Sequence, residues 1–571
     1  MEPVIVAGAG STGLTLSLCL ARHGVPVLLL DDGSSWHERQ PERTVVLRPR
    51  TAELLARLGY TAVHTDAARW TAWRTLSRRQ EVQYVEFDAD TEPSPLHLPQ
   101  DRLRQGLREA LAGQELIKVA PGSRLYAFEQ DEHGLSVHTR GAAGTSGPPD
   151  TWWRGSYLVG CDGPRSTLRK LLQVRFPGRT AVERHAVAAL RVDLPEPGTA
   201  LLHRDPPGGR GSQVLARPLP DGVWRMDWAL PLGGHPLTAD ALVTLIRSTL
   251  AEWCEGSVPP YDLLGSAEYP VHQRLARRWR SGRAFLAGDA AHLLGALGTQ
   301  GLEEGLRDAE NLAWKLAIAW HQGASDTLLD SYQAERRYAV GARLRAADQA
   351  LPLLRSSGAW HTLRRSLLSG PMSRHTDLLT DGHLGRGLLG APPVYDRSPL
   401  ALTTPHGGGR AASGPGAVAW PLGEAADVPV VALDGTRGRL RERLGRDLLA
   451  VLVAPGTGVW ESRHWLTAGL MPQLSTAVAA LPTRTELLVA ENYPGATAHT
   501  VLLIRPDGHV VGAMNGCRPT DLYAYADVAR GGPPLQRPTG GATAGGDTDD
   551  SPGAGAQELS EEAAATAQSR S

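Results

Sequence analysis

Three glycines near the start of the chain have a spacing that can hold a pyrophosphate. Gly8, Gly10 and Gly13 form a G-x-G-x-x-G pattern that also contains Ser11. The first glycine permits a tight turn, the second lets the backbone approach a phosphate, and the third lets a helix pack on a strand. The helix that follows would offer free N–H groups to the phosphates. Asp31 ends the next apolar run, where a carboxylate can bind an adenosine ribose. The pattern predicts dinucleotide binding, the alternative being a glycine-rich turn without a ligand.

Two further glycine–aspartate turns occur downstream, each after an apolar run. Asp162-Gly163 follows Tyr157–Gly160, and Gly288-Asp289 follows Ala284–Ala287. An aspartate between a strand and a helix suits a ribityl or ribose hydroxyl near a phosphate, although one such turn alone is normally a helix N-cap. Three strand-to-turn sites in one chain indicate one extended ligand that contacts all three.

The elements that must position these turns can be read from the apolar pattern. We expect a strand at Val4–Ala7, a helix that ends at Arg22 and a strand at Val25–Leu30. Alternating leucines between residues 14 and 20 favour a strand by periodicity, but a glycine turn of this kind must be followed by a helix. We therefore expect a helix there.

Downstream, the pattern predicts helices over residues 50–60, 100–113, 239–254 and 301–321, with strands over 214–218 and 223–230. A Gly- and Pro-rich stretch over 385–421 predicts a linker, followed by a compact unit over about 418–530. The remainder is rich in Gly, Ala, Ser and acidic residues and is expected to be disordered.

The composition excludes several classes of protein. The chain has 571 residues, which at roughly 150 residues per domain exceeds one ordinary domain. Lys+Arg is 59 and Asp+Glu is 60, a net charge of −1, so we expect no nucleic-acid partner. No apolar run is long enough to span a membrane, and Met1–Pro3 lacks the basic start of a secretory signal. Four cysteines without metal spacing predict free thiols in the cytoplasm and no metal site.

The three turns, in this order and spacing, resemble those of the class A flavoprotein monooxygenases of the p-hydroxybenzoate hydroxylase type. The resemblance is strongest to bacterial aromatic polyketide hydroxylases with an added C-terminal thioredoxin-like domain. It covers most of residues 1–345, and the C-terminal likeness rests on Leu503–Val510. Besides the turns, it includes Arg43–Leu47, Arg50–Leu55, Pro99-Gln100, Arg283–His292, Gln300-Gly301, Asp308–Leu316 and Tyr332–Arg337.

The resemblance implies an α/β fold with a Rossmann-like FAD-binding domain, a mixed-sheet substrate domain, a thioredoxin-like domain and a disordered tail. Without a CxxC pair the C-terminal unit should be redox-silent, an oligomer contact or a packing element, and a homodimer is one outcome. The expected ranges are 1–180 and 273–395 for the FAD-binding domain and its helices, 181–272 for the substrate domain, 396–530 for the thioredoxin-like domain and 531–571 for the tail.

The resemblance also implies cofactors and a reaction. FAD would be reduced by NADPH or NADH and would react with O2 to give a C4a-hydroperoxide, whose distal oxygen a phenolate takes. Gly8, Gly10, Ser11 and Gly13 would hold the pyrophosphate and Asp31 the ribose. The other expected contacts are Arg43 and Gln100 at the pyrophosphate and ribityl chain, Gly288 and Asp289 at the ribityl chain, Asp162 and Gly163 at FAD and the nicotinamide donor, and Gly298, Thr299, Gln300, Gly301 and Leu302 at the isoalloxazine.

One stretch departs from the family pattern. Gly295 and Ala296 replace two prolines, Thr299 replaces a glycine and Glu303 replaces an asparagine. The loss of proline loosens the backbone beside the flavin. Glu303 either turns outward and caps its helix, where the helix dipole favours a carboxylate, or acts on the substrate or tunes the flavin.

Four other residues are candidates for the chemistry, each with a structural alternative. His292 is either a hydrogen-bonding residue or a base. Arg48 and Arg50 are either surface or phosphate contacts, or they steer the substrate or the peroxide. Trp224, which alternates with Trp228 on one strand, is either core or a wall that faces an aromatic substrate.

These residues predict an FAD-dependent monooxygenase that oxygenates a polycyclic aromatic, in a polyketide or antibiotic tailoring step. A Baeyer–Villiger or ring-cleaving reaction on the same class of substrate is the first alternative. A catalytically silent flavin-binding protein is the second. A flavin halogenase is disfavoured because the chain has no Trp-x-Trp-x-Ile-Pro run.

Overall fold

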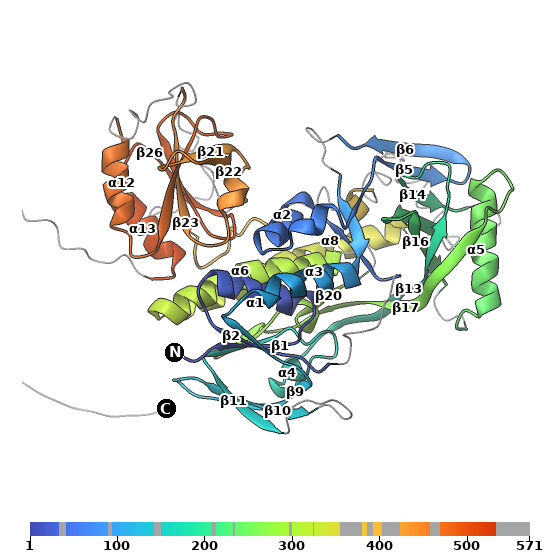
Figure 1. Ribbon diagram of the computed structural model, residues 1–571, viewed down its shortest axis with the longest axis horizontal. Coiled ribbons are helices and arrows are strands. Elements are labelled where there is room, and N and C mark those ends of the chain that lie inside the picture. The colour runs from blue at the N-terminus through green and yellow to red at the C-terminus, as the bar shows by residue number, and fades with distance from the viewer. Residues whose placement is uncertain are drawn as a thin grey trace, which may run out of the picture. The chain divides into compact units, whose positions relative to one another are not determined.

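The computed structural model (Figure 1) describes most of the chain. The side chains of residues 180–183, 300 and 348–354 are outside this description. The described ranges are 1–33, 42–88, 94–141, 150–206, 213–231, 235–295, 300–323, 325–354, 380–384, 392–401, 423–456 and 469–532.

A six-stranded sheet forms the centre of the N-terminal part. Its four inner strands are short apolar runs that are buried on both faces, as expected of parallel strands covered by helices. All neighbours are parallel except the edge strand β18. The order is β18 (Arg280–Ser281), β19 (Ala284–Leu286), β12 (Tyr157–Gly160), β1 (Val4–Ala7), β2 (Val27–Leu30) and β8 (Ile117–Ala120).

Helices pack against this sheet and against one another. The expected helix after the glycine turn is confirmed as α1 (Ser11–Arg22), which is buried almost all round, so its sequence shows no amphipathic period. It packs closely along α6 (Gln300–Gln322), where a Cβ on Gly305 would lie 2.5 Å from Thr12 Oγ1. The other helices here are α2 (Pro49–Arg57), α3 (Gln100–Ala112), α4 (Thr167–Leu171), α7 (Asp326–Tyr332), a π-helical turn (Gln333–Arg337) and α8 (Tyr338–Leu354).

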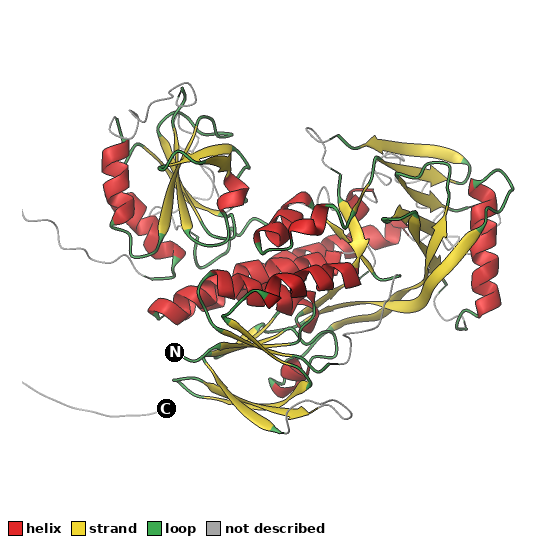
Figure 2. Ribbon diagram, in the orientation of Figure 1, coloured by secondary structure: helices red, strands yellow, loops and turns green. Residues whose placement is uncertain are grey.

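An eight-stranded sheet forms the second layer (Figure 2). One face packs on α5 (Ala239–Trp253), through Ile246 and Leu250 against Trp224 and Trp228. We call this the outer face, and the opposite face, which contacts β3, the inner face. The order is β20 (His292–Leu294), β17 (Tyr261–Leu275), β13 (Gly178–Val192), β16 (Val223–Leu230), β15 (Gln213–Pro218), β14 (Thr199–Arg204), β5 (Ala72–Ser77) and β6 (Gln80–Glu86).

Two three-stranded sheets complete the N-terminal part. One contains β3 (Thr44–Leu47), β7 (Leu96–Pro99) and β4 (Ala68–Arg69), and the other contains β11 (Thr151–Gly155), β10 (Leu135–Gly141) and β9 (Ser123–Gln130). The first brings Thr44 and His97 to the inner face of the eight-stranded sheet, where Thr44 meets Arg225.

The C-terminal part has its own sheet and its own cores. Apolar side chains from both faces of this sheet form two separate clusters. The helices are α12 (Met471–Ala479) and α13 (Pro519–Ala529). The strand order is β22 (Arg437–Arg439), β21 (Pro429–Ala432), β24 (Thr485–Ala490), β23 (Leu448–Val453), β25 (Thr500–Ile504) and β26 (Val510–Asn515).

The helices and strands expected from the sequence occur within a few residues of their expected ends. The expected linker over 385–421 lies outside the described residues except for 392–401, and so does the expected tail from residue 533 onward. Among the described helices, none is both long and apolar enough to cross a membrane.

Candidate flavin site and inner-face cluster

The parallel sheet brings the three turns to one edge. The strands β19, β12, β1 and β2 are neighbours that run in the same direction. Their carboxyl ends lead into Gly288, Cys161, Gly8 and Asp31, so residues far apart in sequence meet there. In open α/β sheets ligands bind outside the carboxyl ends of the strands. The expectation that one extended ligand reaches all three turns therefore has the required geometry.

The glycine turn after β1 leaves room for a phosphate at one position only. Gly8 has φ +109°, and a Cβ on it would lie 2.5 Å from the carbonyl oxygen of Cys161. A Cβ on Gly13 would lie 1.9 Å from the carbonyl oxygen of Gly8. Around Gly10, by contrast, a Cβ would meet no atom within 4 Å, and no side chain caps the start of α1. This helix end can therefore receive an anion beside Gly10.

Asp31 lies at the end of β2 and has an unused acceptor. The residue is 5% exposed, and its Oδ2 has no hydrogen-bond partner in the structure. Burial raises the pKa of its carboxyl to about 6, against the opposing hydrogen bond from the backbone of Gly33. A ribose hydroxyl would supply the donor that this oxygen lacks, so Asp31 fits the expected dinucleotide.

Asp162 is partly used by the protein itself. Its Oδ2 accepts the backbone N–H groups of Thr167 and Leu168 at 2.7 and 3.0 Å, and so caps α4. Its Oδ1 is buried without a partner. Beside it, Gly163 has φ +76°, and a Cβ there would meet no atom within 4 Å. One carboxylate oxygen and an open backbone position remain for a ligand.

Asp308 holds the turn that carries Asp289. This fully buried carboxylate accepts the backbone N–H of Gly288 at 3.0 Å and His292 Nε2 at 2.8 Å. His292 is itself buried and stacks on Trp279, which supports its structural alternative. Asp289 remains accessible to solvent, although the protein around it desolvates its carboxyl and raises its pKa. It is therefore positioned for a ligand hydroxyl.

Arg43 and Gln100 are brought together by the backbone. The N–H of Gln100 donates to the carbonyl of Arg43 at 2.9 Å, and its Nε2 donates to the carbonyl of Thr44 at 3.1 Å. The side chain of Arg43 is exposed. The structure thus places both residues side by side at the start of α3, as a pair that shares one ligand requires.

The start of α6 holds the other expected flavin contacts. Gly298, Thr299 and the side chain of Gln300 lie outside the described residues. A Cβ on Gly301 would meet no atom within 4 Å, and Leu302 packs on the core.

Glu303 does not turn outward. It is 2% exposed, it accepts the hydroxyl of Thr51 at 2.9 Å, and Arg48 Nε lies 3.1 Å from its carboxylate. The replacement of the family's asparagine is thus accounted for by a contact between α6 and α2. Arg48 serves the same contact and so has a structural role in this geometry.

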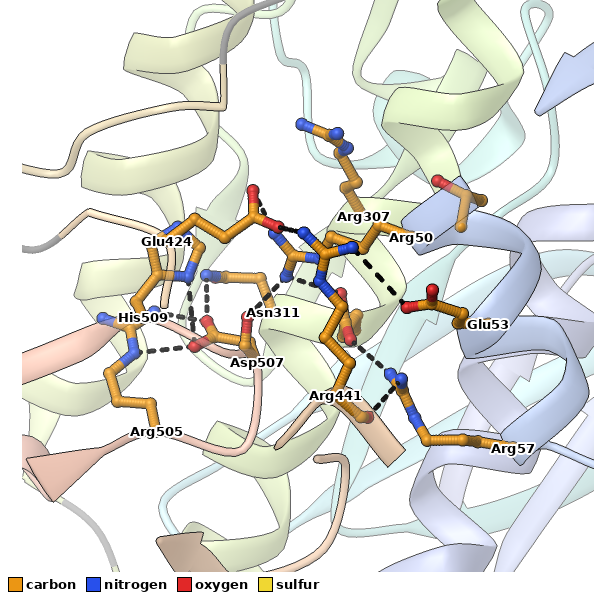
Figure 3. A network of polar contacts seen from close by, with 12 residues as sticks. Arg50, Glu53, Arg57, Arg307, Asn311, Glu424, Arg441, Arg505, Asp507 and His509 are labelled. Atoms are coloured by element: carbon orange, nitrogen blue, oxygen red, sulfur yellow. Dashed lines mark hydrogen bonds and ion pairs between the residues drawn. The ribbon is translucent and has the colours of Figure 1, made fainter. Parts of the chain in front are cut away.

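Arg50 reaches the C-terminal part of the chain (Figure 3). Its guanidinium donates to the carbonyl of Asp507 at 2.6 Å and pairs with Glu424 at 2.8 Å and Glu310 at 3.3 Å. These partners account for its charge, and they support a structural role rather than the steering of a substrate.

The two tryptophans of β16 face α5 and not the inner face. Trp228 is fully buried and donates to Thr249 on α5 at 3.0 Å. Trp224 lines a cavity on this outer face. Trp224 can therefore not contact a molecule on the inner face.

A buried charged cluster on the inner face was not expected from the sequence. Arg225 donates to both carboxylate oxygens of Asp227, at 2.9 and 2.7 Å, and Arg217 donates to one of them at 2.9 Å. Tyr269, which is 36% exposed, contacts both Arg225 and Asp227 from the open side of the cluster. We call these four residues the inner-face cluster. It contains two guanidinium groups for one carboxylate, so its net charge is positive.

The charges of the cluster set its ionisation states. Burial alone would raise the pKa of Asp227, but Arg225 and Arg217 hold that pKa well below its usual range. Burial and the charge of Asp227 raise the pKa of Tyr269 to about 12. Asp227 is therefore ionised and Tyr269 is protonated at neutral pH.

Two buried polar side chains of this part of the chain, Gln273 and His383, have no hydrogen-bond partner. Gln273 follows Tyr269 on the same face of β17, is 5% exposed, and neither its Oε1 nor its Nε2 has a partner. His383 stacks on Trp73, and its two ring nitrogens have no partner either. Burial and the charge of Arg217 lower the pKa of His383 to about 3. Buried polar groups are nearly always satisfied, so these two indicate a place where a ligand binds.

One signal in the sequence could have revealed this cluster. Arg225 and Asp227 stand two residues apart within an otherwise apolar strand, at positions that alternate with Trp224 and Trp228. Such charges point to the opposite face from the apolar residues. In the described part of the chain, no group of His, Cys, Asp and Glu side chains could hold a metal ion.

Comparison with known proteins agrees with this geometry. The family model described as FAD binding domain matches residues 1–347. The chain therefore belongs to the FAD binding domain family. The orphan oxygen of Asp31, the open side of Gly10 and the accessible Asp289 fit that cofactor.

Relatives with assigned activities show which kind of FAD-binding enzyme this chain is. The 12-dehydrotetracycline 5-monooxygenase/anhydrotetracycline 6-monooxygenase of Streptomyces rimosus subsp. rimosus is 30% identical over 540 residues, covering 89% of this chain and 94% of that protein. The 6-methylpretetramide 4-monooxygenase of Streptomyces rimosus is 32% identical over 429 residues, covering 71% and 72%. This chain is accordingly an FAD-dependent monooxygenase.

Solved structures share the fold at lower identity. The flavin-dependent monooxygenase PieE, in complex with FAD and substrate, has a TM-score of 0.72 at 20% identity, covering 92% of this chain and 98% of that chain. Aklavinone-11 hydroxylase, in a ternary complex with FAD and aklavinone, has a TM-score of 0.70 at 23% identity, covering 93% and 99%.

Proposed function

We propose that this enzyme uses NADPH or NADH and O2 to hydroxylate a polycyclic aromatic phenol of the polyketide class. The inner-face cluster carries the proposal, because it is a buried site with a net positive charge beside unpartnered polar groups. The tetracycline-pathway activities of the relatives support the class of substrate. FAD, when bound and reduced, supplies the activation of O2.

The residues of the inner face would prepare the substrate. A phenol must lose its proton to become a good nucleophile, and a nearby positive charge lowers the free energy of the phenolate. Arg217 and Arg225 share one carboxylate and supply that charge. Gln273 and His383 would fix the orientation of the ring through its oxygen substituents, because their polar atoms are the ones without partners.

The residues of the three turns, together with Asp31, Arg43 and Gln100, would bind FAD. Gly8, Gly10, Ser11 and Gly13 would hold the pyrophosphate and Asp31 the ribose. Asp289, supported through the turn that Asp308 binds, would hold the ribityl chain. Arg43 and Gln100 would lie along the pyrophosphate and ribityl chain, and Asp162 and Gly163 would meet FAD and the nicotinamide donor.

Hydroxylation is preferred over Baeyer–Villiger or ring-cleaving chemistry. The alternative was raised by the altered stretch that contains Gly295, Ala296, Thr299 and Glu303. A carboxylate near the anionic reduced flavin would be unfavourable. In the structure Glu303 is bound by Thr51 and Arg48, so it gives no reason to abandon hydroxylation.

The remaining parts of the proposal concern the C-terminal unit and the location. We assign the unit a thioredoxin-like fold without redox function, which its mixed sheet and single Cys517 support. The four free thiols support a cytoplasmic location. Mass measurement in solution would show whether two chains associate.

Single-turnover absorbance measurements test the function. The FAD-loaded protein would be reduced with NADPH, mixed with O2, and followed with and without a panel of polycyclic phenols. We expect one class of phenol to accelerate the reoxidation of the flavin and to gain one oxygen atom from labelled O2. The position of the label separates hydroxylation from insertion into a ring.

An Arg225→Met variant tests the role of the inner-face cluster. The matched control is Arg191→Met, at an exposed arginine on the same sheet. The first should lose the acceleration by phenol and the second should keep it. Reoxidation that no phenol alters would overturn the proposal and favour a silent flavoprotein.

A further inference from the structure

A cavity of about 660 Å³ lies on the outer face of the eight-stranded sheet, between β5, β14 and the end of α5. Figure 1 labels these three elements. Side chains alternate along a strand. Leu201 and His203 therefore line this cavity, whereas Ala200 and Leu202 belong to the inner-face core. The sheet separates the cavity from the inner-face cluster, so a ligand here would not reach the flavin.

The size and the walls of the cavity are those of a ligand site. Its volume equals that of roughly 20 water molecules. Exposed residues such as Arg78 and Ser248 line its rim, so the cavity opens to solvent and a ligand can enter it. Ligand pockets span roughly 300–1,000 Å³ and are mostly apolar and aromatic. Trp224 and Trp253 supply two indole rings here, together with Leu76, Leu194 and Leu201.

His203 fixes one wall and the rim. The Nε1–H of Trp253 donates to Nδ1 of His203 at 3.0 Å. Nε2 then carries the ring proton and donates it to the carbonyl of Arg78 at 2.5 Å. Because His203 is 2% exposed, this chain of hydrogen bonds holds the indole and the Arg78 turn in place before any ligand arrives.

Glu252 offers an unused acceptor inside this frame. Its Oε1 is buried without a hydrogen-bond partner, and His203 Nε2 lies 3.9 Å away, too far for a hydrogen bond. Burial raises the pKa of this carboxyl. A buried acceptor without a donor is unfavourable, so the group that belongs there carries a hydroxyl or an ammonium.

Charge at the rim decides between these two donors. Arg74 is neutralised by Glu81 and Glu196. Arg78 and Arg79 are exposed at the rim, and in the described part of the chain neither forms an ion pair. Arg79 nevertheless acts on the carboxyl of Glu252 and opposes the rise of its pKa. Because the charge of Glu252 is already opposed by this guanidinium, its free oxygen calls for a hydroxyl donor rather than a second cation.

We infer that this outer-face cavity binds a polycyclic phenol, with its ring against Trp224 and Trp253 and a hydroxyl on Glu252. The inference goes beyond the proposed function, because it assigns a second ligand to a site that the sheet separates from the inner-face site, where the substrate would be hydroxylated. Each chain would therefore bind two molecules of the same chemical class, one on each face of the sheet.

Binding stoichiometry on the FAD-loaded protein tests the inference, with alizarin (1,2-dihydroxyanthraquinone) as the probe. Equilibrium dialysis would count bound alizarin, and the flavin absorbance would report the inner-face site separately. The blocking variant is Ser248→Phe, at an exposed residue that lines the cavity. Thr244→Phe is its matched control, one turn earlier on the exposed side of α5 and away from the cavity.

We expect two equivalents in the wild type and Thr244→Phe, and one in Ser248→Phe with an unchanged flavin response. Glu252→Gln should keep both sites but weaken the outer one roughly tenfold, the effect of losing a charged hydrogen bond. One equivalent in the wild type with a saturating flavin response, or no difference between the two phenylalanine variants, overturns the inference. One equivalent that Ser248→Phe removes, with no flavin response, supports the cavity and counts against the proposed substrate.

Discussion

Arg505 and Glu335 form a fully buried ion pair that joins the C-terminal unit to the FAD-binding part of the chain. Arg505 donates from Nη1 to Oε1 of Glu335 at 2.7 Å and from Nη2 to Oε2 at 2.9 Å. The same carboxylate receives Lys315 Nζ at 2.7 Å and Asn311 Nδ2 at 2.8 Å. Glu335 is thus saturated by donors from both parts.

The next residue along the chain continues this connection toward the flavin site. Arg336 lies in the same π-helical turn as Glu335 and donates to Asp308 Oδ1 at 2.9 Å. Asp308 binds the backbone of Gly288. One short turn therefore links the C-terminal unit to the loop that presents Asp289.

Replacing Arg505 should destabilise the whole chain. Arg505→Ala leaves the carboxylates of Glu335 and Asp507 buried with fewer partners, and the loss of one member of a buried pair costs about 3–5 kcal/mol. Urea unfolding of the FAD-loaded protein measures this change. Arg518→Ala, at an exposed arginine that pairs only with Asp521 within its own helix turn, should change the midpoint little. Equal urea midpoints for the two variants would show that the buried pair of Arg505 and Glu335 does not stabilise the chain.

Two glycines of the first turn should respond differently to alanine. Gly13→Ala puts a Cβ 1.9 Å from the carbonyl oxygen of Gly8, so the protein should fail to fold or lose several kcal/mol of stability. Gly10→Ala meets no protein atom within 4 Å and should fold normally. If the pyrophosphate binds beside Gly10 as proposed, this Cβ would take its place, and FAD affinity should fall at least tenfold. Fluorescence titration with FAD measures the affinity, and normal binding by Gly10→Ala would rule out a phosphate there.

FAD binding should strengthen as the pH rises through about 6. Without a ligand the pKa of Asp31 is raised to about 6, so the folded chain binds a proton there that the unfolded chain has already released. The stability of the FAD-free protein should therefore fall as pH rises from about 4, where the unfolded carboxyl ionises, to about 6, where the folded one does. A ribose hydroxyl donates to the ionised form, so affinity should be about tenfold higher at pH 7 than at pH 5. Asp31→Asn should remove this slope, and a slope equal to that of the wild type would assign the titration to another group.

Replacing Gln273 should weaken the binding of the phenol without lowering the stability of the protein. Gln273→Leu removes a buried polar group that has no partner, so the thermal midpoint should stay the same or rise. The KM for the phenol should rise severalfold, because the amide is then missing from the substrate side. Asn311→Leu is the matched control, since this amide is fully used by Glu335, Asp507 and Lys315. It should destabilise the protein. A lower midpoint for Gln273→Leu would show that the amide is satisfied within the protein.

The local pattern was sufficient to predict the elements and the flavin turns. The glycine spacing before α1 outweighed the alternating leucines, because only a helix can follow such a turn. The strands β1, β15 and β16 were predicted with the same or nearly the same ends that they have in the structure. The carboxylates after β2, β12 and β19 could be assigned to one edge of the sheet, because parallel strands align their carboxyl ends.

The roles of the charged residues were decided only by the tertiary structure. Arg50 has a partner 457 positions away in Asp507, and Arg48 has one 255 positions away in Glu303. No spacing rule connects such positions, because the distance between two side chains depends on how whole elements pack. For the same reason the inner-face cluster and the outer-face cavity were not foreseen: which face of β16 meets β3 and which meets α5 is a property of the packed sheet. The sequence determined a chain that folds around FAD, and the packing determined which arginines hold the protein together and which remain for a substrate.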